Sequence, residues 1–237
     1  MNINWEARWD AFVRAFVDNN GYERVLEGLR NTVIIAIVGL LIGILIGVII
    51  AIVRVTPKYK IAPNILDKIC TVYVGFFRGT PIVVQLLLGY YVLLPLLGIR
   101  IPSLTVCIII FGFNSGAYIS EIMRGGIQSV DRGQLEAGRA LGLGYGTAMM
   151  RIVVPQAVKN IIPTLGNEFI TLVKETSVVS FVGALDLYTA FSFIASNNYE
   201  FMVPYLVMAA MYLALVIIIT IGIRFIERRL AKSDRKR

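Results

Sequence analysis

Five stretches of the chain consist mainly of apolar residues and are bounded by charged or turn-forming positions. A helix crosses the hydrocarbon core of a membrane with about 20 residues, and each stretch approaches or exceeds that length. The pattern therefore predicts an all-α integral membrane protein with five transmembrane helices. The predicted spans are residues 32–53, 82–97, 104–120, 161–185 and 201–223.

The second stretch contains a polar interruption. Residues 69–98 as one continuous helix would be about 45 Å long, which exceeds a hydrocarbon core of about 30 Å. The sequence Arg78-Gly79-Thr80-Pro81 lies inside this stretch. Either the part before Arg78 is an amphipathic helix at the cytoplasmic face, or the helix is broken within the protein. In both cases Thr80 is the predicted N-cap of the span and Pro81 its first helical residue.

Residues 1–27 have a different pattern, in which aromatic residues recur at helical spacing with charges between them. We expect either an amphipathic helix lying in the membrane interface or an ordinary helix packed on the protein. The segment lacks the uninterrupted apolar run of a secretory signal. The helix is expected to end at residues 18–21. The aromatic residues are Trp5, Trp9, Phe12 and Phe16.

Glycines recur at every fourth position in the first predicted span. Gly39, Gly43 and Gly47 therefore lie on one face of the helix. Such a ridge of small residues lets a second helix approach closely. The alternative is a membrane helix that merely tolerates glycine.

The composition changes the picture little, because it is typical of a membrane protein. Of the 237 residues, 57% are hydrophobic and 16% are charged, whereas a soluble domain has about 25% charged residues. This balance excludes a soluble globular enzyme and a disordered chain. The net charge of +8 is ascribed to basic residues at the cytoplasmic ends of helices, and not to nucleic-acid binding.

Lysine and arginine are distributed unevenly among the connections between spans. Residues 54–80 and 122–160 carry five each, the tail from Arg224 carries seven, and residues 186–200 carry none. Because positive residues favour the cytoplasmic side, the N-terminus is predicted outside and the C-terminus inside, with residues 232–237 as a basic cytoplasmic tail. The aromatic residues expected at the outer interface are Phe191, Phe193 and Tyr199.

Residue types that serve common enzyme chemistry are scarce. The chain has no histidine, and its two cysteines, Cys70 and Cys107, have apolar neighbours and are interpreted as buried hydrophobic residues. No phosphate-binding loop of the GxxxxGK(S/T) type is present. We therefore expect no catalytic site, no metal, no bound cofactor and no ATPase site on this chain.

The longest polar connection, residues 121–160, contains the most specific pattern. Residues 135–141 favour a helix, and three alternating glycines from Gly142 onward interrupt it. We expect two short helices joined by a tight turn. Residues 149–154 are largely apolar although the connection is polar, so either a partner protein or the chain's own membrane domain covers them.

This connection resembles the EAA loop of bacterial ABC-importer permeases. The consensus of that loop is Glu-Ala-Ala, three residues, Gly, nine residues, Ile, one residue and Leu-Pro. Two positions depart from it, since Gly138 replaces the second alanine and Val154 the leucine. Glycine in place of alanine is expected to weaken the helix by about 1 kcal/mol. The residues that match at the consensus spacing are Glu136, Ala137, Gly142, Ile152 and Pro155.

Three further segments resemble the polar amino-acid uptake branch of the same family. They are GFFRGTPIVVQ at 75–85, FNSGAYISEIMRGGI at 113–127 and LVKETSVVSFVGALDL at 172–187. The resemblance implies a transmembrane domain over residues 28–231 with the type I importer permease fold, five spans and an external N-terminus. Residues 1–27 fall outside it.

The resemblance also implies partners. Two permease subunits, identical or related, would form the pathway, and two separate ATP-binding subunits would hold ATP and Mg²⁺. An external solute-binding protein would deliver the substrate, and the location would be the bacterial cytoplasmic membrane with its lipids. Within the coupling loop 134–163, residues 136–146 would form a coupling helix seated in a groove of the ATPase. The implied coupling residues are Glu136, Ala137, Gly138, Ala140, Leu141, Gly142, Ile152 and Pro155.

Ionisable residues inside the fourth span are candidates for substrate contact, because such groups are costly in a membrane. On a helix, Thr164, Glu168, Thr171 and Glu175 share one face, with Lys174 at its flank. Lys174 and Glu175 suit the carboxylate and the ammonium group of an amino acid. The alternative is an internal Glu–Lys ion pair that holds helices together.

In the third span, Asn114, Tyr118 and Glu121 share a face beside Ser115, with interhelical hydrogen bonds as the alternative role. Arg78 either faces the pathway or reaches lipid phosphates. The candidate substrate residues are Lys174, Glu175, Thr176, Ser177, Asn114, Ser115, Tyr118, Glu168, Thr171 and Arg78.

The sequence thus predicts a membrane permease subunit of an ATP-driven importer for a polar amino acid. The acidic residues of the fourth span favour a basic amino acid. Two alternatives stay open. One is a secondary transporter in which Lys174 and Glu175 titrate or bind the driving ion. The other is a membrane scaffold that transports nothing and docks a partner through residues 134–163.

Overall fold

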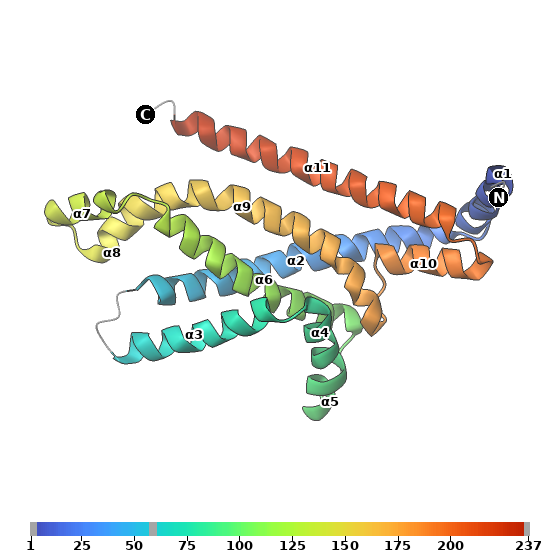
Figure 1. The fold of residues 1–237 in the computed structure, drawn as a ribbon, viewed down its shortest axis with the longest axis horizontal. Coiled ribbons are helices and arrows are strands. Elements are labelled where there is room, and N and C mark those ends of the chain that lie inside the picture. Colours follow the sequence, from blue (N-terminus) through green and yellow to red (C-terminus); the bar gives the residue numbers. More distant parts are fainter. Residues whose placement is uncertain (1–3, 57–60, 235–237) are drawn as a thin grey trace. The chain divides into compact units, whose positions relative to one another are not determined.

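The computed structural model describes residues 4–56 and 61–234, and each regular element in these two ranges is a helix (Figure 1). Residues 57–60 of the predicted basic connection and residues 235–237 of the predicted tail lie outside the described residues. Of the elements, η1, η2 and η3 are π-helical and η4 is a 3₁₀ helix. In chain order they are α1 Trp5–Val13, η1 Arg14–Asp18, α2 Gly21–Val55, α3 Ile61–Gly79, α4 Ile82–Leu87, η2 Leu88–Leu93, α5 Leu94–Leu96, α6 Ser103–Gln128, α7 Arg132–Ala140, α8 Tyr145–Ala148, η3 Met149–Val153, α9 Val154–Glu175, η4 Thr176–Val182, α10 Leu187–Asn198 and α11 Met202–Asp234.

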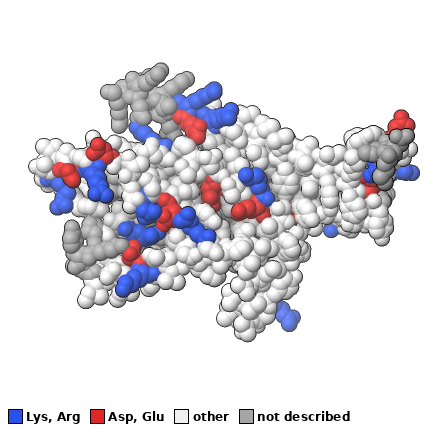
Figure 2. Space-filling view, viewed as in Figure 1, with Lys and Arg blue, Asp and Glu red and all other residues white. Residues whose placement is uncertain are grey.

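Three described helices are each long and apolar enough to cross a membrane, namely α2, α6 and the Met202–Arg229 part of α11. Two bent pairs of helices meet the same criteria when each pair is taken as one span, which gives up to five. The pairs are Ile61–Gly79 with Ile82–Leu96, and Tyr145–Val182 with Leu187–Asn197. Figure 2 shows that most of the visible surface is uncharged and that acidic and basic side chains lie on it in mixed groups. The chain is therefore a nearly all-helical, multi-pass membrane protein.

The helices extend beyond the predicted spans. The first predicted span starts at residue 32, but α2 begins at Gly21. The third was expected to end at residue 120, but α6 continues to Gln128. The apolar run marks only the part of a helix that suits hydrocarbon, and charged residues with good helix propensity continue the same helix beyond it.

The chain divides into two compact units, each with its own apolar core. Unit 1 comprises Met1–Gly39, Pro81–Phe111 and Thr171–Ile219. Unit 2 comprises Leu40–Thr80, Gly112–Ile170 and Thr220–Arg237.

In unit 2, two glycines of α2 lie directly against α6. A Cβ added at Gly43 would lie 2.8 Å from the Cβ of Ser115, and one added at Gly47 would lie 2.7 Å from Cγ2 of Ile119. Side chains larger than hydrogen do not fit at these distances unless α6 moves. The predicted close approach of a second helix is therefore confirmed for Gly43 and Gly47.

The contact is reciprocal, because α6 has glycines of its own. A Cβ at Gly112 would lie 2.5 Å from Cγ2 of Ile42, and one at Gly116 would lie 2.7 Å from Cγ2 of Ile46. We call Gly43, Gly47, Gly112 and Gly116 the glycine seam. Contacts advance along both helices in the same direction, so α2 and α6 are parallel. This agrees with the first and third spans of a chain that crosses back once between them.

The next neighbour of α6 in unit 2 is α9, and here the contacts advance in opposite directions. The hydroxyl of Ser115 donates to Glu168 at 3.2 Å, and the amide of Asn160 donates to the hydroxyl of Ser129 at 2.8 Å. Hence α6 and α9 are antiparallel. The buried core residues at the Ser129 end are Val130, Val153, Ala157 and Ile161.

The second predicted span is interrupted where expected, but its capping differs from the prediction. α3 ends at Gly79 and α4 begins at Ile82, with Pro81 in the N-cap position and no side-chain cap. The hydroxyl of Thr80 donates to the carbonyl of Phe76 at 2.8 Å, so it satisfies a backbone carbonyl in the last turn of α3. The predictions of Thr80 as N-cap and of Pro81 as first helical residue are therefore wrong.

The fourth predicted span was also expected to be one helix, and this prediction is wrong from Thr176 onward. α9 ends at Glu175, and η4 continues as a 3₁₀ helix until Gly183, whose φ is +69°. A 3₁₀ helix has three residues per turn, so every third residue faces the same way. The residues of η4 that are 3% exposed or less follow that period: Thr176, Val179 and Val182.

The core of unit 1 joins α1, α10 and the start of α11, which Figure 1 shows close together. Phe191 is fully buried in this core, so its predicted place at the membrane interface is wrong. The period of α10 turns Phe191 inward and Phe193 outward, where the guanidinium of Arg24 lies 3.9 Å from the Phe193 ring centroid. Tyr199 is 87% exposed.

The N-terminal helix α1 divides its aromatic residues between two faces. Phe12 is buried in the core of unit 1 and its ring stacks 5.2 Å from that of Phe16. Trp5 and Trp9 are about half exposed, at 52% and 53%. α1 is therefore packed on the protein by one face and presents two tryptophans on the other. The chain breaks near Asn20, whose φ is +55°, as predicted.

Candidate functional site

The connection between α6 and α9 contains one short helix, α7, and a tight turn into α8, which continues through η3 into α9 without a break. The tight turn is confirmed, but the prediction of a second separate short helix is wrong. α7 begins after Asp131, whose side chain caps it by accepting from the backbone N–H of Gly133 at 2.6 Å. α7 ends at Ala140 and α8 starts at Tyr145. The expectation that residues 136–146 form one coupling helix is therefore wrong. We call residues 132–148 the α7–α8 hairpin.

The turn of the α7–α8 hairpin is a Schellman motif. Leu143 donates its N–H to the carbonyl of Gly138 at 3.2 Å, and Gly142 donates to Arg139 at 3.0 Å. This arrangement requires a left-handed residue after the helix cap, and Gly142 supplies it with a φ of +86°. Gly142 is thus the glycine on which the sharp turn depends.

The tip of the hairpin is exposed, whereas its base is closely packed. Leu141 is 85% exposed at the turn. Gly138 is buried, and a Cβ there would lie 2.7 Å from Cδ1 of Ile152 and 3.4 Å from Cβ of Ala148. Gly138 therefore lies where α7 contacts α8 and η3. The other implied coupling residues on the surface are Glu136, Ala137, Ala140, Gly142 and Pro155.

The chain itself covers part of the apolar stretch at residues 149–154. Val153 is 4% exposed and lies in the core of unit 2, and Ile152 is half-buried against Gly138. Met150 remains 67% exposed. The hydroxyl of Tyr145 donates to the carbonyl of Val55 at 3.1 Å, which ties α8 to the end of α2. The hairpin therefore has a supported base and an uncovered apolar tip.

Five candidate substrate residues lie in unit 2, and the structure brings four of them together in two pairs. Ser115, fully buried, donates to Glu168. The guanidinium of Arg78 lies 5.4 Å from the centroid of the Tyr118 ring. Asn114 is 4% exposed and donates to the carbonyl of Phe77 at 3.3 Å, so its amide joins two helices.

The other five lie in unit 1, at the junction of α9 and η4. Lys174 is exposed and Glu175 half-buried, and neither takes part in an ion pair with any described residue. The alternative of an internal Glu–Lys ion pair that holds helices together stays a prediction, as does substrate contact. Ser177 and Thr171 are half-buried. Thr176 is fully buried, and its hydroxyl donates to the carbonyl of Val173 at 2.8 Å.

A cluster of charged residues in unit 2 joins α2, α3 and α6. Glu121 accepts from Arg124 at 2.6 Å and from Arg54, and the guanidinium of Arg78 lies 3.8 Å from it. Arg54 also lies 3.9 Å from Asp67. We call these five residues the Glu121 cluster. The sequence placed Glu121 on the face of α6 shared by other candidates, but its arginine partners come from three helices and were not predicted.

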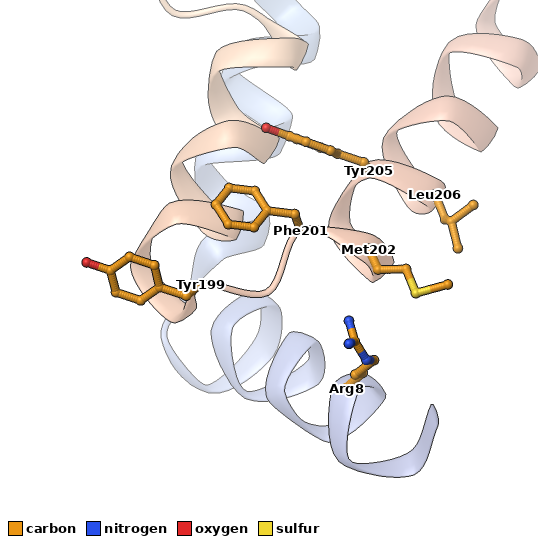
Figure 3. Close-up of a pocket in the computed structure, with 6 residues that line it drawn as sticks. All are labelled: Arg8, Tyr199, Phe201, Met202, Tyr205 and Leu206. Atoms are coloured by element: carbon orange, nitrogen blue, oxygen red, sulfur yellow. The ribbon is translucent and has the colours of Figure 1, made fainter. Parts of the chain in front are cut away.

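At the N-terminal end of unit 1, an open groove of about 520 Å³ lies between α1 and the start of α11. Figure 3 shows Arg8 reaching from α1 toward the first turn of α11. Its guanidinium lies 3.0 Å from the carboxylate of Glu200, so the two charges balance. The other residues that line the groove are Tyr199, Phe201, Met202, Tyr205 and Leu206.

Comparison with known proteins relates this arrangement to a transport family. Residues 39–232 match the family described as binding-protein-dependent transport system inner membrane component. The chain is 37% identical over 210 residues to the arginine transport system permease protein ArtQ of Bacillus subtilis, covering 89% of this chain and 94% of the relative. It is 34% identical over 214 residues to the probable glutamine ABC transporter permease protein GlnM of Bacillus subtilis, covering 90% of this chain and 96% of the relative.

A solved structure agrees with the two relatives. It is the crystal structure of an amino acid ABC transporter with histidines, to which this chain is similar with a TM-score of 0.83 and 34% sequence identity. The match covers 97% of this chain and 100% of the other. The two chains therefore share the same fold.

Proposed function

The chain belongs to the family of binding-protein-dependent transport system inner membrane components, and from that membership we propose that it is the permease subunit of an ATP-driven importer of a polar amino acid. The two relatives support the substrate class, because one is named for arginine and the other for glutamine. Both substrates are polar amino acids.

The proposed topology has five spans, over residues 28–231, in the bacterial cytoplasmic membrane, with the N-terminus outside and the C-terminus inside. The distribution of lysine and arginine supports this orientation. The helix directions within unit 2 support the alternation of the spans, because α6 is parallel to α2 and antiparallel to α9. Residues 1–27 would lie at the outer interface, where the exposed Trp5 and Trp9 suit the lipid headgroup region.

The α7–α8 hairpin is the proposed docking point for the ATPase. The observation that carries this is Leu141, an apolar side chain that is 85% exposed at the tip of a hairpin whose base is packed. A rigid hairpin with an apolar tip can seat in a groove and transmit its movement. ATP and Mg²⁺ would be held by two such ATPase subunits. A second permease, identical or related, and an external solute-binding protein complete the assembly.

Substrate contact is proposed for the exposed Lys174 and the half-buried Glu175, which have no ion-pair partner among the described residues. They suit the carboxylate and the cationic groups of an amino acid. Ser177 adds a hydroxyl beside them. Thr176 has no place in this contact, because its side chain is fully buried.

The test is uptake of labelled arginine and glutamine by vesicles that contain the permease, its ATPase and its binding protein. We expect ATP-dependent uptake, and a loss of about tenfold or more in Leu141→Asp, because burying an unpaired charge in an apolar contact is costly. Leu66→Ala, at a half-exposed leucine outside the hairpin, is a control. Uptake that persists without the ATPase would overturn the proposal in favour of a gradient-driven transporter.

A second variant addresses the substrate site. Glu175→Gln removes one negative charge, so it should weaken uptake of arginine more than uptake of glutamine. An equal loss for the two substrates would contradict the assignment of Glu175 to a cationic side chain.

A further inference from the structure

The groove between α1 and the start of α11 combines one charged side chain with an apolar lining. Arg8 lies on its α1 side, whereas Phe201 and Tyr205 come from the first turn of α11 and the residue before it (Figure 3). The ring centroids of these two aromatic residues are 6.0 Å apart, and Leu206 beyond them is 55% exposed. Pockets for small organic ligands measure about 300–1,000 Å³. The groove, with about 520 Å³, is therefore large enough for a ligand that has an apolar part and one polar group.

The guanidinium of Arg8 uses only part of its hydrogen-bonding capacity. Its Nη1 donates to both carboxylate oxygens of Glu200, at 3.0 and 3.1 Å. The Nε and Nη2 atoms carry the other three N–H groups, and these form no hydrogen bond with any described residue. Two parallel N–H groups on one edge of a guanidinium match two oxygens of a phosphate group. The edge formed by Nε and Nη2 is therefore available to such an anion.

The negative charge of Glu200 is shared between Arg8 and α11. Glu200 also accepts from the backbone N–H groups of Met202 and Val203, at 3.0 and 3.4 Å. The first turn of a helix carries a partial positive charge, so these N–H groups take up part of the carboxylate charge. The side chain of Glu200 is 14% exposed and that of Arg8 is 41% exposed. The groove thus presents more of its cation than of its anion to a ligand.

The groove lies at the end of a helix that is long and apolar enough to cross a membrane, because that span begins at Met202. The ends of a transmembrane helix lie at the level of the lipid headgroups, where tryptophan is enriched. On α1, Arg8 lies one turn from Trp5 and next to Trp9, and both tryptophans are about half exposed. At this depth of the membrane, a phospholipid is the ligand that carries both a phosphate group and an apolar chain.

We propose that this groove is a phospholipid-binding site. The phosphodiester group of the lipid accepts from Nε and Nη2 of Arg8, and an acyl chain lies against Phe201, Tyr205 and Leu206. The lipid then joins α1, which lies outside the residues 39–232 that match the family, to the first turns of α11. The inference rests on the membrane location of α11 and goes beyond the proposed transport.

The experiment uses the fluorescence of Trp5 and Trp9, the two tryptophans of the chain. The full chain in detergent micelles is titrated with phosphatidylglycerol that is brominated near the top of its acyl chains, because bromine quenches tryptophan at close range. We expect quenching that saturates at a small mole fraction of lipid. Arg8→Gln should raise the half-saturating fraction about fivefold, the factor expected for one basic residue at an anionic lipid surface. An unchanged fraction would overturn the inference.

Two further variants separate lipid binding from the packing of α1. Arg14→Gln removes the same charge from an exposed position of η1 outside the groove, and should bind lipid as the wild type does. Glu200→Gln weakens the ion pair but retains Arg8 and an acceptor for the N–H groups of α11, so it should bind lipid at least as tightly as the wild type. Equal losses in Arg8→Gln and Glu200→Gln would mean that only the docking of α1 matters, and would overturn the inference.

Two other ligands test the phosphate contact. Diacylglycerol with the same brominated chains lacks the phosphate group, so it should bind the wild type and Arg8→Gln equally and more weakly than phosphatidylglycerol binds the wild type. Inorganic phosphate lacks the chains and should not reverse the quenching by phosphatidylglycerol. Diacylglycerol that binds as tightly as phosphatidylglycerol, or phosphate that reverses the quenching, would contradict the site.

A segment of a protein partner is the alternative occupant of the groove. In that case the quenching would rise in proportion to the lipid fraction without saturating, as it does for a tryptophan that meets only bulk lipid, and the inference would be overturned. The titration requires no transport. Failure of ATP-dependent uptake would therefore contradict the proposed function alone, whereas loss of saturable quenching would contradict this site alone.

Discussion

Two regions of unit 2 are rich in glycine and use it for opposite purposes. In the glycine seam between α2 and α6, the space of each missing Cβ is occupied by the neighbouring helix, at 2.5–2.8 Å. In the α7–α8 hairpin, a Cβ at Gly142, Gly144 or Gly146 would meet nothing within 4 Å. In the hairpin, it is the backbone conformation that requires glycine, and of these three residues only Gly142 has a positive φ.

The difference teaches how glycine spacing relates to its role. Glycines four residues apart in an apolar run stay on one helix face, so they can form a contact surface. Glycines two residues apart cannot share a helix face and instead weaken the helix. A substitution in the seam should therefore change stability, whereas one in the hairpin should change the shape of the turn.

The largest effect is expected in the seam. Gly112→Val places side-chain atoms where Cγ2 of Ile42 lies, 2.5 Å from the new Cβ. Overpacking of this kind costs up to about 3 kcal/mol. We expect a loss of that size in the free energy of unfolding, measured by chemical denaturation of the solubilised protein. Gly125→Val is the control, because the same helix leaves open space at Gly125; equal losses would contradict the seam.

The second-largest effect is expected at Glu121, where charged side chains and not glycines join α2 to α6. Glu121→Gln removes the charge that Arg54 and Arg124 share. Because the glutamate side chain is only 16% exposed, loss of its charge-assisted hydrogen bonds should cost about 2 kcal/mol of unfolding free energy. Glu136→Gln, at an exposed position of α7, should cost nothing measurable in the same denaturation experiment.

A smaller effect on stability is expected at the turn of the hairpin. Gly142→Ala forces alanine into a φ of +86°, which costs about 1 kcal/mol. ATP-driven uptake should fall more than stability does, because the tip carrying Leu141 is displaced. Gly142→Asn should recover part of the uptake, since asparagine tolerates the left-handed conformation. Equal uptake by the alanine and asparagine variants would argue against a geometric role.

The smallest effect is expected at Gly146, the last of the three glycines in the hairpin. Gly146 lies in α8 with open space around its Cβ position and without a positive φ. Gly146→Ala should leave ATP-driven uptake unchanged and stabilise the protein by about 0.5 kcal/mol, because alanine loses less backbone entropy in a helix. A clear loss of uptake would show that the surface of α8 near this residue is itself part of an interface.

Prediction from the sequence succeeded where one local pattern decides the structure. The helices, the break before Pro81, the close approach at Gly43 and Gly47, and the tight glycine turn after α7 all follow from spacing within a short segment. It failed where a polar group had two possible partners. The hydroxyl of Thr80 was predicted to cap α4, but it bonds the last turn of α3.

The candidate site shows the same limit. Thr176 was grouped with Lys174, Glu175 and Ser177 because all four are polar neighbours in the chain. The packing of this helix separates them, since Thr176 shares the buried face with Leu172 and Val173 while Lys174 is exposed and Glu175 and Ser177 are half-buried. Phe191 was expected at an interface for similar reasons, and the packing of α10 against α1 buries it.

The sequence by itself determined that this is a membrane protein, that it is helical and to which family it belongs. The reason is that the length of apolar runs, the charge distribution and the motif spacing are properties of local runs of residues. Tertiary structure decided which polar side chains face one another. The three arginines around Glu121 come from three helices, and the carboxylate of Asp186, which caps α10, accepts from the hydroxyl of Tyr212 on α11. Such groups come together only when helices that are distant in the chain pack against each other. This packing produces no periodic pattern in the sequence, so the contacts could not be predicted from it.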